Sequence, residues 1–263
     1  MKPPATVTLP PQGRIFRYRD RVTLADVSPA GRARLDALAR WLQDAAYHDL
    51  RDSELDDNGV WIVRRLCLRV RRFPRLPDEI EVATFCSGAA ALWAERSSLV
   101  SCGGEVAGEA VALWVHLRPD GVRPQPLPAG FDAVYGPSAM GRRVRAGLRH
   151  PPEPPAGASA RPWHFRGADL DLAGHVNNAV YWEALEDELV ASEPGDGLDA
   201  EIEYRAATGA GEGTVLAAGP MRWIAGADGA VVATLTAQAG PSEYASSDSG
   251  APQSSSERGS GMP

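Results

Sequence analysis

Cysteine is scarce in this chain of 263 residues: there are three, at positions 67, 86 and 102. The number is odd and none of the three forms a CxxC pair, so the sequence indicates neither a disulfide framework nor a metal site. We predict that Cys67, Cys86 and Cys102 are buried as small apolar residues.

Long apolar runs are also missing. No stretch approaches the roughly 18 uninterrupted apolar residues that suggest a membrane span, so we expect none. Residues 1–13 carry Lys2 and several prolines but no apolar segment of the kind found in a secretory signal. A cytoplasmic location is therefore the default expectation.

Positive charge is in short supply as well. The formal net charge of −7 at pH 7 argues against a general nucleic-acid binder. The apolar fraction of 44% is ordinary for a soluble globular protein and sufficient for a sizeable core. Length and composition together predict one large or two small domains.

The first half of the chain contains one helical pattern and several strand patterns. Residues 15–23 alternate apolar and polar side chains as a half-buried strand does, and residues 35–50 place apolar side chains at helical spacing. Four further β-like segments are separated by turn residues: 61–72, 79–86, 92–100 and 106–117. This order predicts an α+β arrangement with the helix packed on one face of an antiparallel sheet.

The second half repeats this plan in a shorter form. We expect a strand near 163–166, a helix at 177–191, and strands at 200–207, 213–225 and 230–239. Adding 143 to first-half numbers places Ala25-Asp26 on Ala168-Asp169 and Leu42 on Leu185. A sequence duplication is the economical explanation.

Composition divides the chain into five segments. We predict a flexible N-terminus (1–13), a first domain (14–118), a proline-rich extended connector (119–162), a second domain (163–239) and a disordered tail (240–263) rich in Ser, Gly and Pro. An apolar patch from Phe131 to Tyr135 can dock the connector on a domain surface.

The most informative stretch is 169–188, which reads DLDLAGHVNNAVYWEALEDE. Asn177 or Asn178 can cap the helix that follows, and the free N–H groups of its first turn can stabilise an oxyanion. The plainer interpretation is that these are ordinary capping and surface residues. Against it, Asp171 aligns with Ser28 and His175 with Arg32 in the first half, which indicates one functional and one structural copy.

These motifs resemble a known family. G-H-V-N-N-x-x-Y after D-x-D is similar to the active-site segment of hotdog thioesterases, and the chain from about 16 to 238 resembles the acyl-ACP thioesterases. Further matching segments are QDAA at 43–46 with His48, GVWIV at 59–63, residues 84–88, WAER at 93–96, Trp114-Val115, and EYR at 203–205. The resemblance implies an α+β fold of two tandem hotdog domains, each an antiparallel sheet wrapped around a central helix.

The resemblance also assigns candidate residues. It implies that Asp171 acts as nucleophile or general base toward water and that His175 positions it or the thioester. Val176, Asn177 and Asn178 would stabilise the oxyanion and position the substrate.

The chain departs from the family's catalytic segment D-x-N-x-H. The family asparagine falls on Ala173, and a later acid and cysteine fall on Ala207 and Thr208. Thr208 is one auxiliary candidate. Glu183 or Glu186 on the following helix can replace the missing acid, as in other hotdog enzymes, but we expect both to be exposed charges on the helix face.

A run of arginines is the candidate partner-binding surface. Its members lie along and just beyond one predicted strand: Arg64, Arg65, Arg69, Arg71, Arg72 and Arg75. Alternation along a strand places at least Arg69 and Arg71 on the outer face, where they can steer an acidic carrier protein. The alternative is a solvated sheet face with no partner.

The leading hypothesis from the sequence is a thioesterase that hydrolyses fatty acyl-ACP to free fatty acid and ACP, with acyl-CoA as another possible substrate and no metal or organic cofactor. A non-catalytic double-hotdog module that binds acyl chains or carrier protein is the main alternative, favoured by Ala173 and Ala207. A hotdog dehydratase is a weaker third. Acyl chain length stays open, as does the choice between monomer and homodimer.

Overall fold

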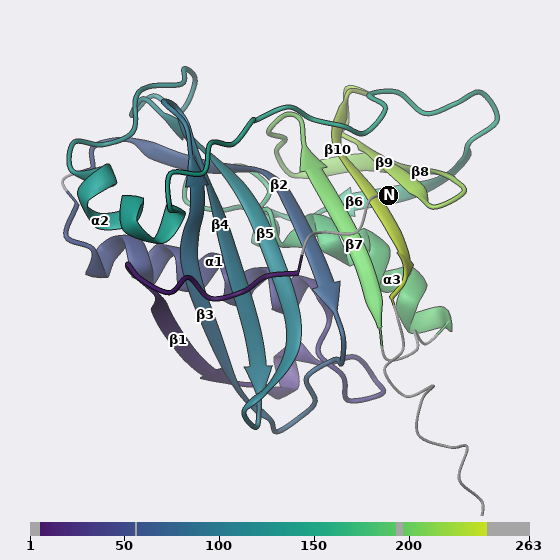
Figure 1. The fold of residues 1–263 in the computed structure, drawn as a ribbon. Coiled ribbons are helices and arrows are strands. Elements are labelled where there is room, and N and C mark those ends of the chain that lie inside the picture. The colour runs from purple at the N-terminus through teal and green to yellow at the C-terminus, as the bar shows by residue number, and fades with distance from the viewer. Residues whose placement is uncertain (1–5, 56, 193–196, 241–263) are drawn as a thin grey trace, which may run out of the picture.

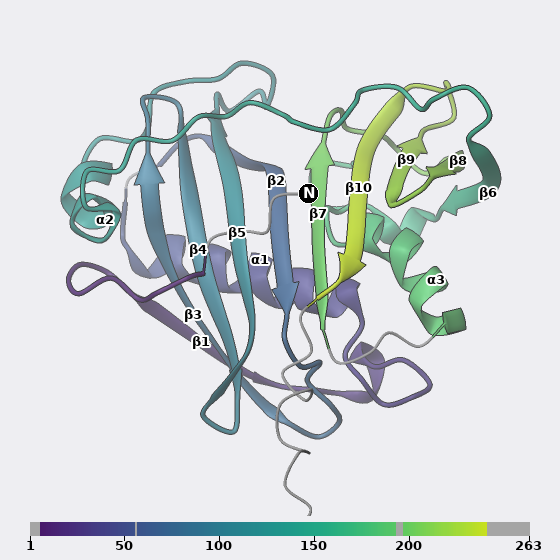
Figure 2. The ribbon, with the colours of Figure 1, turned by 45° about the vertical axis from the view of Figure 1, so that its right-hand side comes forward.

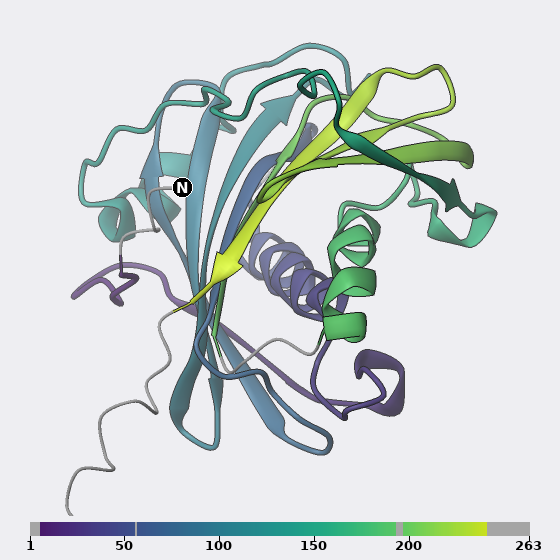
Figure 3. The ribbon, with the colours of Figure 1, turned by 90° about the vertical axis from the view of Figure 1, so that its right-hand side faces the viewer.

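A computed structural model describes residues 6–55, 57–192 and 197–240. The predicted tail beyond residue 240, and residues 1–5 of the predicted flexible N-terminus, lie outside the described residues. Figure 1 shows a broad sheet with the helices α1 (Leu35–Asp52) and α3 (Glu183–Ser192) behind it, and the side view of Figure 3 shows both helices on the concave side of that curved sheet. Among the described residues, no helix is long and apolar enough to cross a membrane.

Each half of the chain contributes the same order of elements. The first half contains β1 (Phe16–Arg21), η1 (Leu24–Asp26), α1 (Leu35–Asp52), β2 (Val60–Val70), β3 (Glu79–Ala89), β4 (Trp93–Cys102) and β5 (Glu105–Leu117). The second half contains β6 (Ser159–Phe165), η2 (Gly167–Asp169), η3 (Val180–Trp182), α3 (Glu183–Ser192), β7 (Leu198–Tyr204), β8 (Gly211–Ala218), β9 (Met221–Ala225) and β10 (Val231–Ala239). Between them lies α2 (Phe131–Ala139).

The ten described strands form one continuous sheet in the order β1-β3-β4-β5-β2-β7-β10-β9-β8-β6. Read inward from its own edge, each half gives the same order, and the halves meet where β2 and β7 pair antiparallel from Arg65↔Glu203 to Val70↔Leu198. The fold class predicted from the sequence is confirmed. The sheets of the two halves join edge to edge through this pair of strands.

Both halves share one hydrophobic core on the concave side of the sheet. Leu38 and Leu42 of α1 are buried there with Ile202 of β7 and Trp182 of η3, which is 0% exposed. The alanines of α1 give the helix a small-residue face that lets it approach the strands closely. The cysteine prediction is also confirmed, because all three are free and buried.

One strand prediction was wrong. The segment 213–225 is a hairpin of β8 and β9 instead of a single strand. Gly219, with a φ of 53°, takes a left-handed conformation that glycine adopts without strain, and Pro220 cannot donate a ladder hydrogen bond. The two residues therefore turn the chain back on itself.

The connector is not extended throughout, as its prolines predicted, because it contains the helix α2. Phe131 and Tyr135 are buried in a cluster with Cys86 of β3 and Ala94 of β4, so the expected docking patch does pack on the first half. From α2 the connector runs along the upper rim of the sheet to β6 (Figure 2). The described part of the N-terminal segment is also packed: Val7 is buried, and its N–H donates to Glu109 Oε2 at 2.8 Å.

Candidate active site

The motif loop between β6 and α3 is a closed turn, which we call the motif turn (residues 171–175). The N–H of Asp171 donates to the carbonyl of His175 at 2.8 Å, and the N–H of Gly174 donates to the carbonyl of Asp171 at 3.0 Å. Gly174 has a φ of 75°, a left-handed conformation that favours glycine. The glycine before the histidine is therefore required by the turn.

The first half contains the same turn at residues 28–32. The N–H of Ser28 donates to the carbonyl of Arg32 at 2.8 Å, and Gly31 has a φ of 77°. In both halves the acid two residues before the turn is buried, as Asp26 and as Asp169. Of the two acids in D-x-D, Asp169 is therefore the structural one.

Asp171 presents its carboxylate at the surface of the motif turn. Its Oδ1 accepts the N–H groups of Ala173 at 2.8 Å and of His175 at 3.2 Å, so Oδ2 is the oxygen left to meet a water or a substrate. His175 is also exposed. Among the described residues no hydrogen bond joins the two side chains, so the structure brings them into one turn but not into contact.

A cavity of about 620 Å³ opens beside the motif turn, and we call it the Asp171 cavity. Its polar lining includes Asp171 and Asn178, whereas His175 does not line it. Its other lining residues come mostly from the first half and from α2: Gln43, Asp44, Ala46, Tyr47, Leu50, Gly59, Val60, Trp61, Cys86, Ala94, Glu95, Arg96, Trp114, Phe131 and Tyr135, with Leu172 from the motif turn. Asp171 therefore stands beside a largely apolar and aromatic chamber built by the other half.

The residues after the motif turn are held from both sides. Val176 donates its N–H to the carbonyl of Thr208 at 2.9 Å, and the hydroxyl of Tyr204 donates to the carbonyl of Asn178 at 2.9 Å. The Oδ1 of Asn177 accepts the N–H of Ala179 at 2.9 Å, which closes a local turn just before η3, whose own N-cap, Ala179, has no side-chain cap. Thr208 thus acts through its backbone and does not line the Asp171 cavity.

Glu186 closes the equivalent site in the first half. Its carboxylate forms a buried ion pair with Arg32 at 2.8 Å and accepts the N–H of Leu35, the first residue of α1, at 2.9 Å. The guanidinium of Arg32 also lies 4.8 Å from the ring centroid of Phe73. The expectation of an exposed helix charge at Glu186 was wrong, because α3 turns this side chain toward the first-half turn.

Glu183 lies outside the Asp171 cavity. Its carboxylate is 3.4 Å from Arg166, and it is half-buried. Burial raises the pKa of the Glu183 carboxyl and the charge of Asp36 adds to the rise, while Arg166 opposes it. An auxiliary catalytic role for Glu183 stays a prediction, and its absence from the cavity lining does not favour it.

Gln43 and Asp44 were not among the predicted site residues, yet both line the Asp171 cavity. Subtracting 143 from the number of Glu186 gives Gln43, so a neutral amide on α1 occupies the place that a carboxylate takes in the other half. Burial raises the pKa of the Asp44 carboxyl, and the charges of His48 and Arg40 reduce that rise. Alignment of the repeats could have indicated both residues, because it maps the acids of α3 onto α1.

The predicted arginine surface is largely paired within the protein. Arg65 is buried and donates to the carbonyl of Gly147 at 2.9 Å, and Arg69 lies 2.9 Å from Asp199. Its other members are held as well: Arg64 by the carbonyl of Arg205, Arg71 by Glu109, Arg72 by Asp78, and Arg75 by the carbonyl of Ala30.

The alternative interpretation, a solvated sheet face, is therefore wrong for this part of β2. The strand lies at the centre of the sheet, and the connector crosses its outer face. Of the five arginines from 64 to 72 named as partner-binding, only Arg72 is exposed. Binding of an acidic partner by them stays a prediction.

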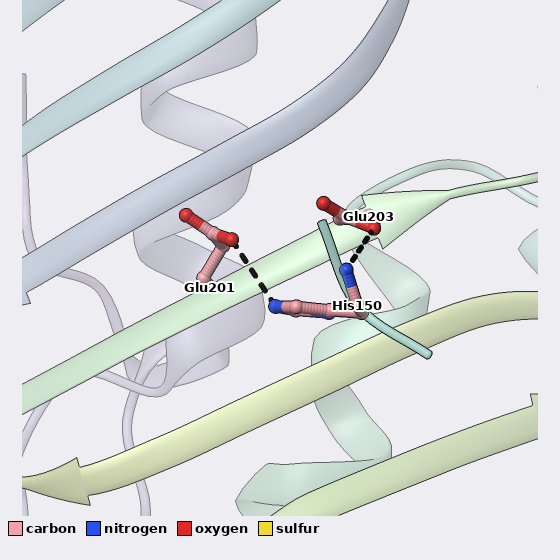
Figure 4. Close-up of side chains that lie close together, drawn as sticks. All are labelled: His150, Glu201 and Glu203. Atoms are coloured by element: carbon pink, nitrogen blue, oxygen red, sulfur yellow. Dashed lines mark hydrogen bonds and ion pairs between the residues drawn. The ribbon is translucent and has the colours of Figure 1, made fainter. Parts of the chain in front are cut away.

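A second polar cluster lies on the outer face of β7 (Figure 4). His150, Glu201 and Glu203 bring ligand-type atoms within 4.8 Å of one another. The Glu203 oxygens accept the N–H groups of Arg149 at 2.5 Å and His150 at 3.0 Å, while His150 Nε2 lies 3.1 Å from Glu201 Oε1. These atoms already satisfy one another, so the cluster fastens the connector to β7.

Comparison with known proteins follows the same two halves. Residues 13–135 match the family described as acyl-ACP thioesterase N-terminal domain, and residues 153–214 match the acyl-ACP thioesterase C-terminal domain. An uncharacterised protein of Mycobacterium tuberculosis is 26% identical over 190 residues, which cover 70% of this chain and 74% of that protein. Chloroplastic oleoyl-acyl carrier protein thioesterase 2 of Arabidopsis thaliana is 25% identical over 204 residues, which cover 66% of this chain and 56% of the plant protein.

Solved structures show a similar fold. An acyl-ACP thioesterase from Bacteroides thetaiotaomicron superimposes with a TM-score of 0.68 at 19% identity, covering 85% of this chain and 96% of the other. The 12:0-ACP thioesterase from Umbellularia californica gives a TM-score of 0.67 at 20% identity, covering 86% and 97%. At these identities the similarity establishes the double-hotdog architecture.

Proposed function

Because the chain belongs to the acyl-ACP thioesterase family, we propose that it hydrolyses fatty acyl thioesters of acyl carrier protein to free fatty acid and carrier thiol. The observation that carries the proposal is the position of Asp171, whose carboxylate lines an aromatic cavity of about 620 Å³. Such a cavity can hold an acyl chain while the thioester stays beside the carboxylate.

Asp171 is the proposed nucleophile or general base. As a base, its Oδ2 accepts a proton from a water that attacks the thioester carbonyl carbon. As a nucleophile, Oδ2 attacks that carbon itself, and water then hydrolyses the mixed anhydride. In both routes the C–S bond breaks and the carrier thiolate takes up a proton. His175, on the exposed side of the motif turn, is the proposed positioning residue.

The N–H of Asn178 is the proposed donor to the oxyanion. Its counterpart in the first half is the N–H of Leu35, which holds a carboxylate oxygen of Glu186 at 2.9 Å. In the first half, the N–H at this position thus binds a negatively charged oxygen. In the second half Asn178 lines the cavity and the facing residue is the uncharged Gln43, so the N–H is available to the thioester oxygen.

A non-catalytic acyl-binding module is the second candidate. Ala173 and Ala207, where the family carries an asparagine and an acid, favour it, and so does the absence of His175 from the cavity lining. The carrier could also be coenzyme A instead of acyl carrier protein. Action on soluble thioesters would fit the cytoplasmic location proposed from the sequence.

The deciding experiment compares three carboxamide variants with acyl-ACP and acyl-CoA substrates. We expect Asp171→Asn to lower kcat by about two to three orders of magnitude, the cost of losing one essential polar group. Asp44→Asn removes the other aspartate of the cavity wall, and Asp187→Asn removes its exposed counterpart on α3. Both should retain most of the activity.

Each outcome separates the hypotheses. Loss of turnover in Asp44→Asn with retention in Asp171→Asn would transfer the catalytic role to Asp44. Failure of the unaltered protein to hydrolyse any thioester, while it still binds acyl chains, would support the binding module. Relative rates on the two carriers decide between acyl carrier protein and coenzyme A.

A further inference from the structure

The deep end of the Asp171 cavity is formed by the connector and not by either half alone. Phe131 and Tyr135 of α2 line the cavity and are 5% and 2% exposed, whereas Leu172 of the motif turn, which also lines it, is 109% exposed. Figure 1 shows α2 at one end of α1 and α3 at the other. The cavity therefore runs from the motif turn along α1 and ends at α2.

Three aromatic rings close this end. The rings of Phe131 and Tyr135 lie 4.9 Å apart between centroids, and the Trp61 ring of β2 stacks on Phe131 at 6.0 Å. The sheet side of the same end is lined by small side chains, Cys86 of β3 and Ala94 of β4. The large side chains at this end belong mostly to α2, and the sheet contributes small ones. The position of α2 therefore determines the depth of the cavity.

Tyr135 and Phe131 are held differently. The Tyr135 hydroxyl donates to the carbonyl of Asp49 at 3.5 Å, and the Arg96 guanidinium, itself 2.7 Å from Asp49, lies 5.7 Å from the Tyr135 ring centroid. Phe131 makes only apolar contacts through its side chain. It is thus the ring that can be shortened without breaking a polar network.

We propose that α2 sets the longest acyl chain that the Asp171 cavity accepts, with Phe131 as the limiting side chain. The inference rests on the proposed function in that it takes the cavity as the acyl site. It makes the connector, which joins the halves, a specificity element. Removing the Phe131 ring lengthens the cavity on the side of α2. A larger side chain in place of Ala94 shortens it.

The test uses Phe131→Ala, Ala94→Val and the matched control Val134→Ala. Val134 is a side chain of α2 in the same cluster, but it does not line the cavity. Hydrolysis of a series of saturated acyl-CoA and acyl-ACP substrates gives kcat/KM against chain length. Free fatty acids of the same lengths give a second profile from thermal stabilisation, which needs no turnover. For chains beyond the original limit, Phe131→Ala should gain about tenfold in relative preference for each two methylenes newly accommodated.

The two readouts distinguish this inference from the function on which it rests. Longer chains accepted by Phe131→Ala and shorter ones by Ala94→Val, with Val134→Ala unchanged, support it. An active protein whose Phe131→Ala and Ala94→Val profiles both match the original overturns it. Absence of hydrolysis together with shifted fatty-acid binding would remove the thioesterase proposal and leave the role of α2 intact. If Phe131→Ala does not fold, Ala94→Val decides by the sign of its shift.

Discussion

Ala173 is the residue at which the motif turn departs from the family's catalytic segment, and its surroundings have room for the missing side chain. It is exposed, and its N–H already donates to Asp171 Oδ1 at 2.8 Å. An asparagine here would place an amide next to the carboxylate without burying a polar group. The departure therefore affects the chemistry of the site and not its folding.

We predict that Ala173→Asn raises kcat by about tenfold, within the range that one well-placed polar group supplies. The matched control is Ala30→Asn, because Ala30 occupies the same position in the first-half turn, where the Arg32–Glu186 ion pair fills the equivalent site. Steady-state hydrolysis of one acyl thioester by the two variants checks the prediction. Equal effects in both, or none in either, would show that the asparagine position is not limiting in this chain.

The sequence predicted the site only in part at this scale. The D-x-D and HVNN pattern indicated the motif turn, and Asp171 does line the cavity. The same pattern could not indicate which turn residues face inward, and His175 proves to be exposed. Gln43 and Arg96 reach the cavity from α1 and β4, a proximity set by how the halves pack and not by any local pattern.

The beginnings of α1 and α3 are related elements with opposite surroundings. At α1, the buried Glu186 accepts the N–H of Leu35 and pairs with Arg32, both with about 3–4% exposed side chains. At α3, the facing residue is Gln43, and the cavity takes the place of the ion pair. The ion pair of Glu186 and Arg32 closes the start of α1, whereas the start of α3 faces the cavity.

Glu186→Gln should therefore lower stability and leave catalysis intact. Removing the carboxylate leaves the guanidinium of Arg32 buried without its ion-pair partner. Such a change costs about 3–5 kcal/mol of stability in proteins. Urea unfolding measures the loss, and kcat per folded molecule should stay within about twofold, since no transition-state contact is removed. Glu183→Gln, at a half-buried neighbour, should cost less than about 1 kcal/mol. A folded Glu186→Gln variant with greatly reduced kcat would restore Glu186 as an auxiliary catalytic acid.

Periodicity predicted the elements whose stability comes from burying one face. α1 was expected at 35–50 and spans Leu35–Asp52, and the four strands after it lie within a few residues of their predicted ends. α2 was missed as a helix because it has 9 residues, contains Pro137 and begins after Gly130. Such a short helix is marginal alone and is stabilised by packing against β3 and β4, which no local pattern records.

At the scale of the molecule, the duplication produces two similar turns within the described residues, and of these two the motif turn stands beside an open cavity. The strand orders of the halves correspond, and the β2–β7 pair relates them. Arg32 and Glu186 fill one of the two equivalent positions, so the remaining one can be shaped by side chains of the first half and by α2. This division explains why the first-half turn carries a serine and an arginine where the second carries Asp171 and His175.

The outer face of the central strands holds a second set of buried charges, under the connector. Glu201 receives a hydrogen bond from the Cys67 thiol at 2.7 Å and pairs with His150. Burial alone would raise the pKa of the Glu201 carboxyl, but hydrogen bonds from His150 and Cys67 and the charges of His150 and Arg65 bring it below its usual value. The ionised form of Glu201 is thus favoured by folding.

This network gives stability a defined dependence on pH. A carboxyl whose pKa is lower in the folded protein stabilises the fold above its unfolded pKa, and this contribution is lost as the pH falls through the folded pKa. Interactions also lower the pKa values of Asp26, Asp36, Asp57 and Glu81. The raised pKa values of Asp44 and Glu183 act in the opposite direction, but they are fewer. We therefore predict that the free energy of unfolding declines as the pH falls below about 4.5.

Urea unfolding across that range measures the slope. In Glu201→Gln the decline should be shallower and stability at neutral pH lower, because the connector loses a charged partner at His150. In Glu183→Gln the slope should steepen slightly, because a carboxyl that opposes the trend is removed. A Glu201→Gln protein with an unchanged slope would mean that Glu201 does not link proton binding to folding, and the acid dependence would then rest with the ion pairs around α1.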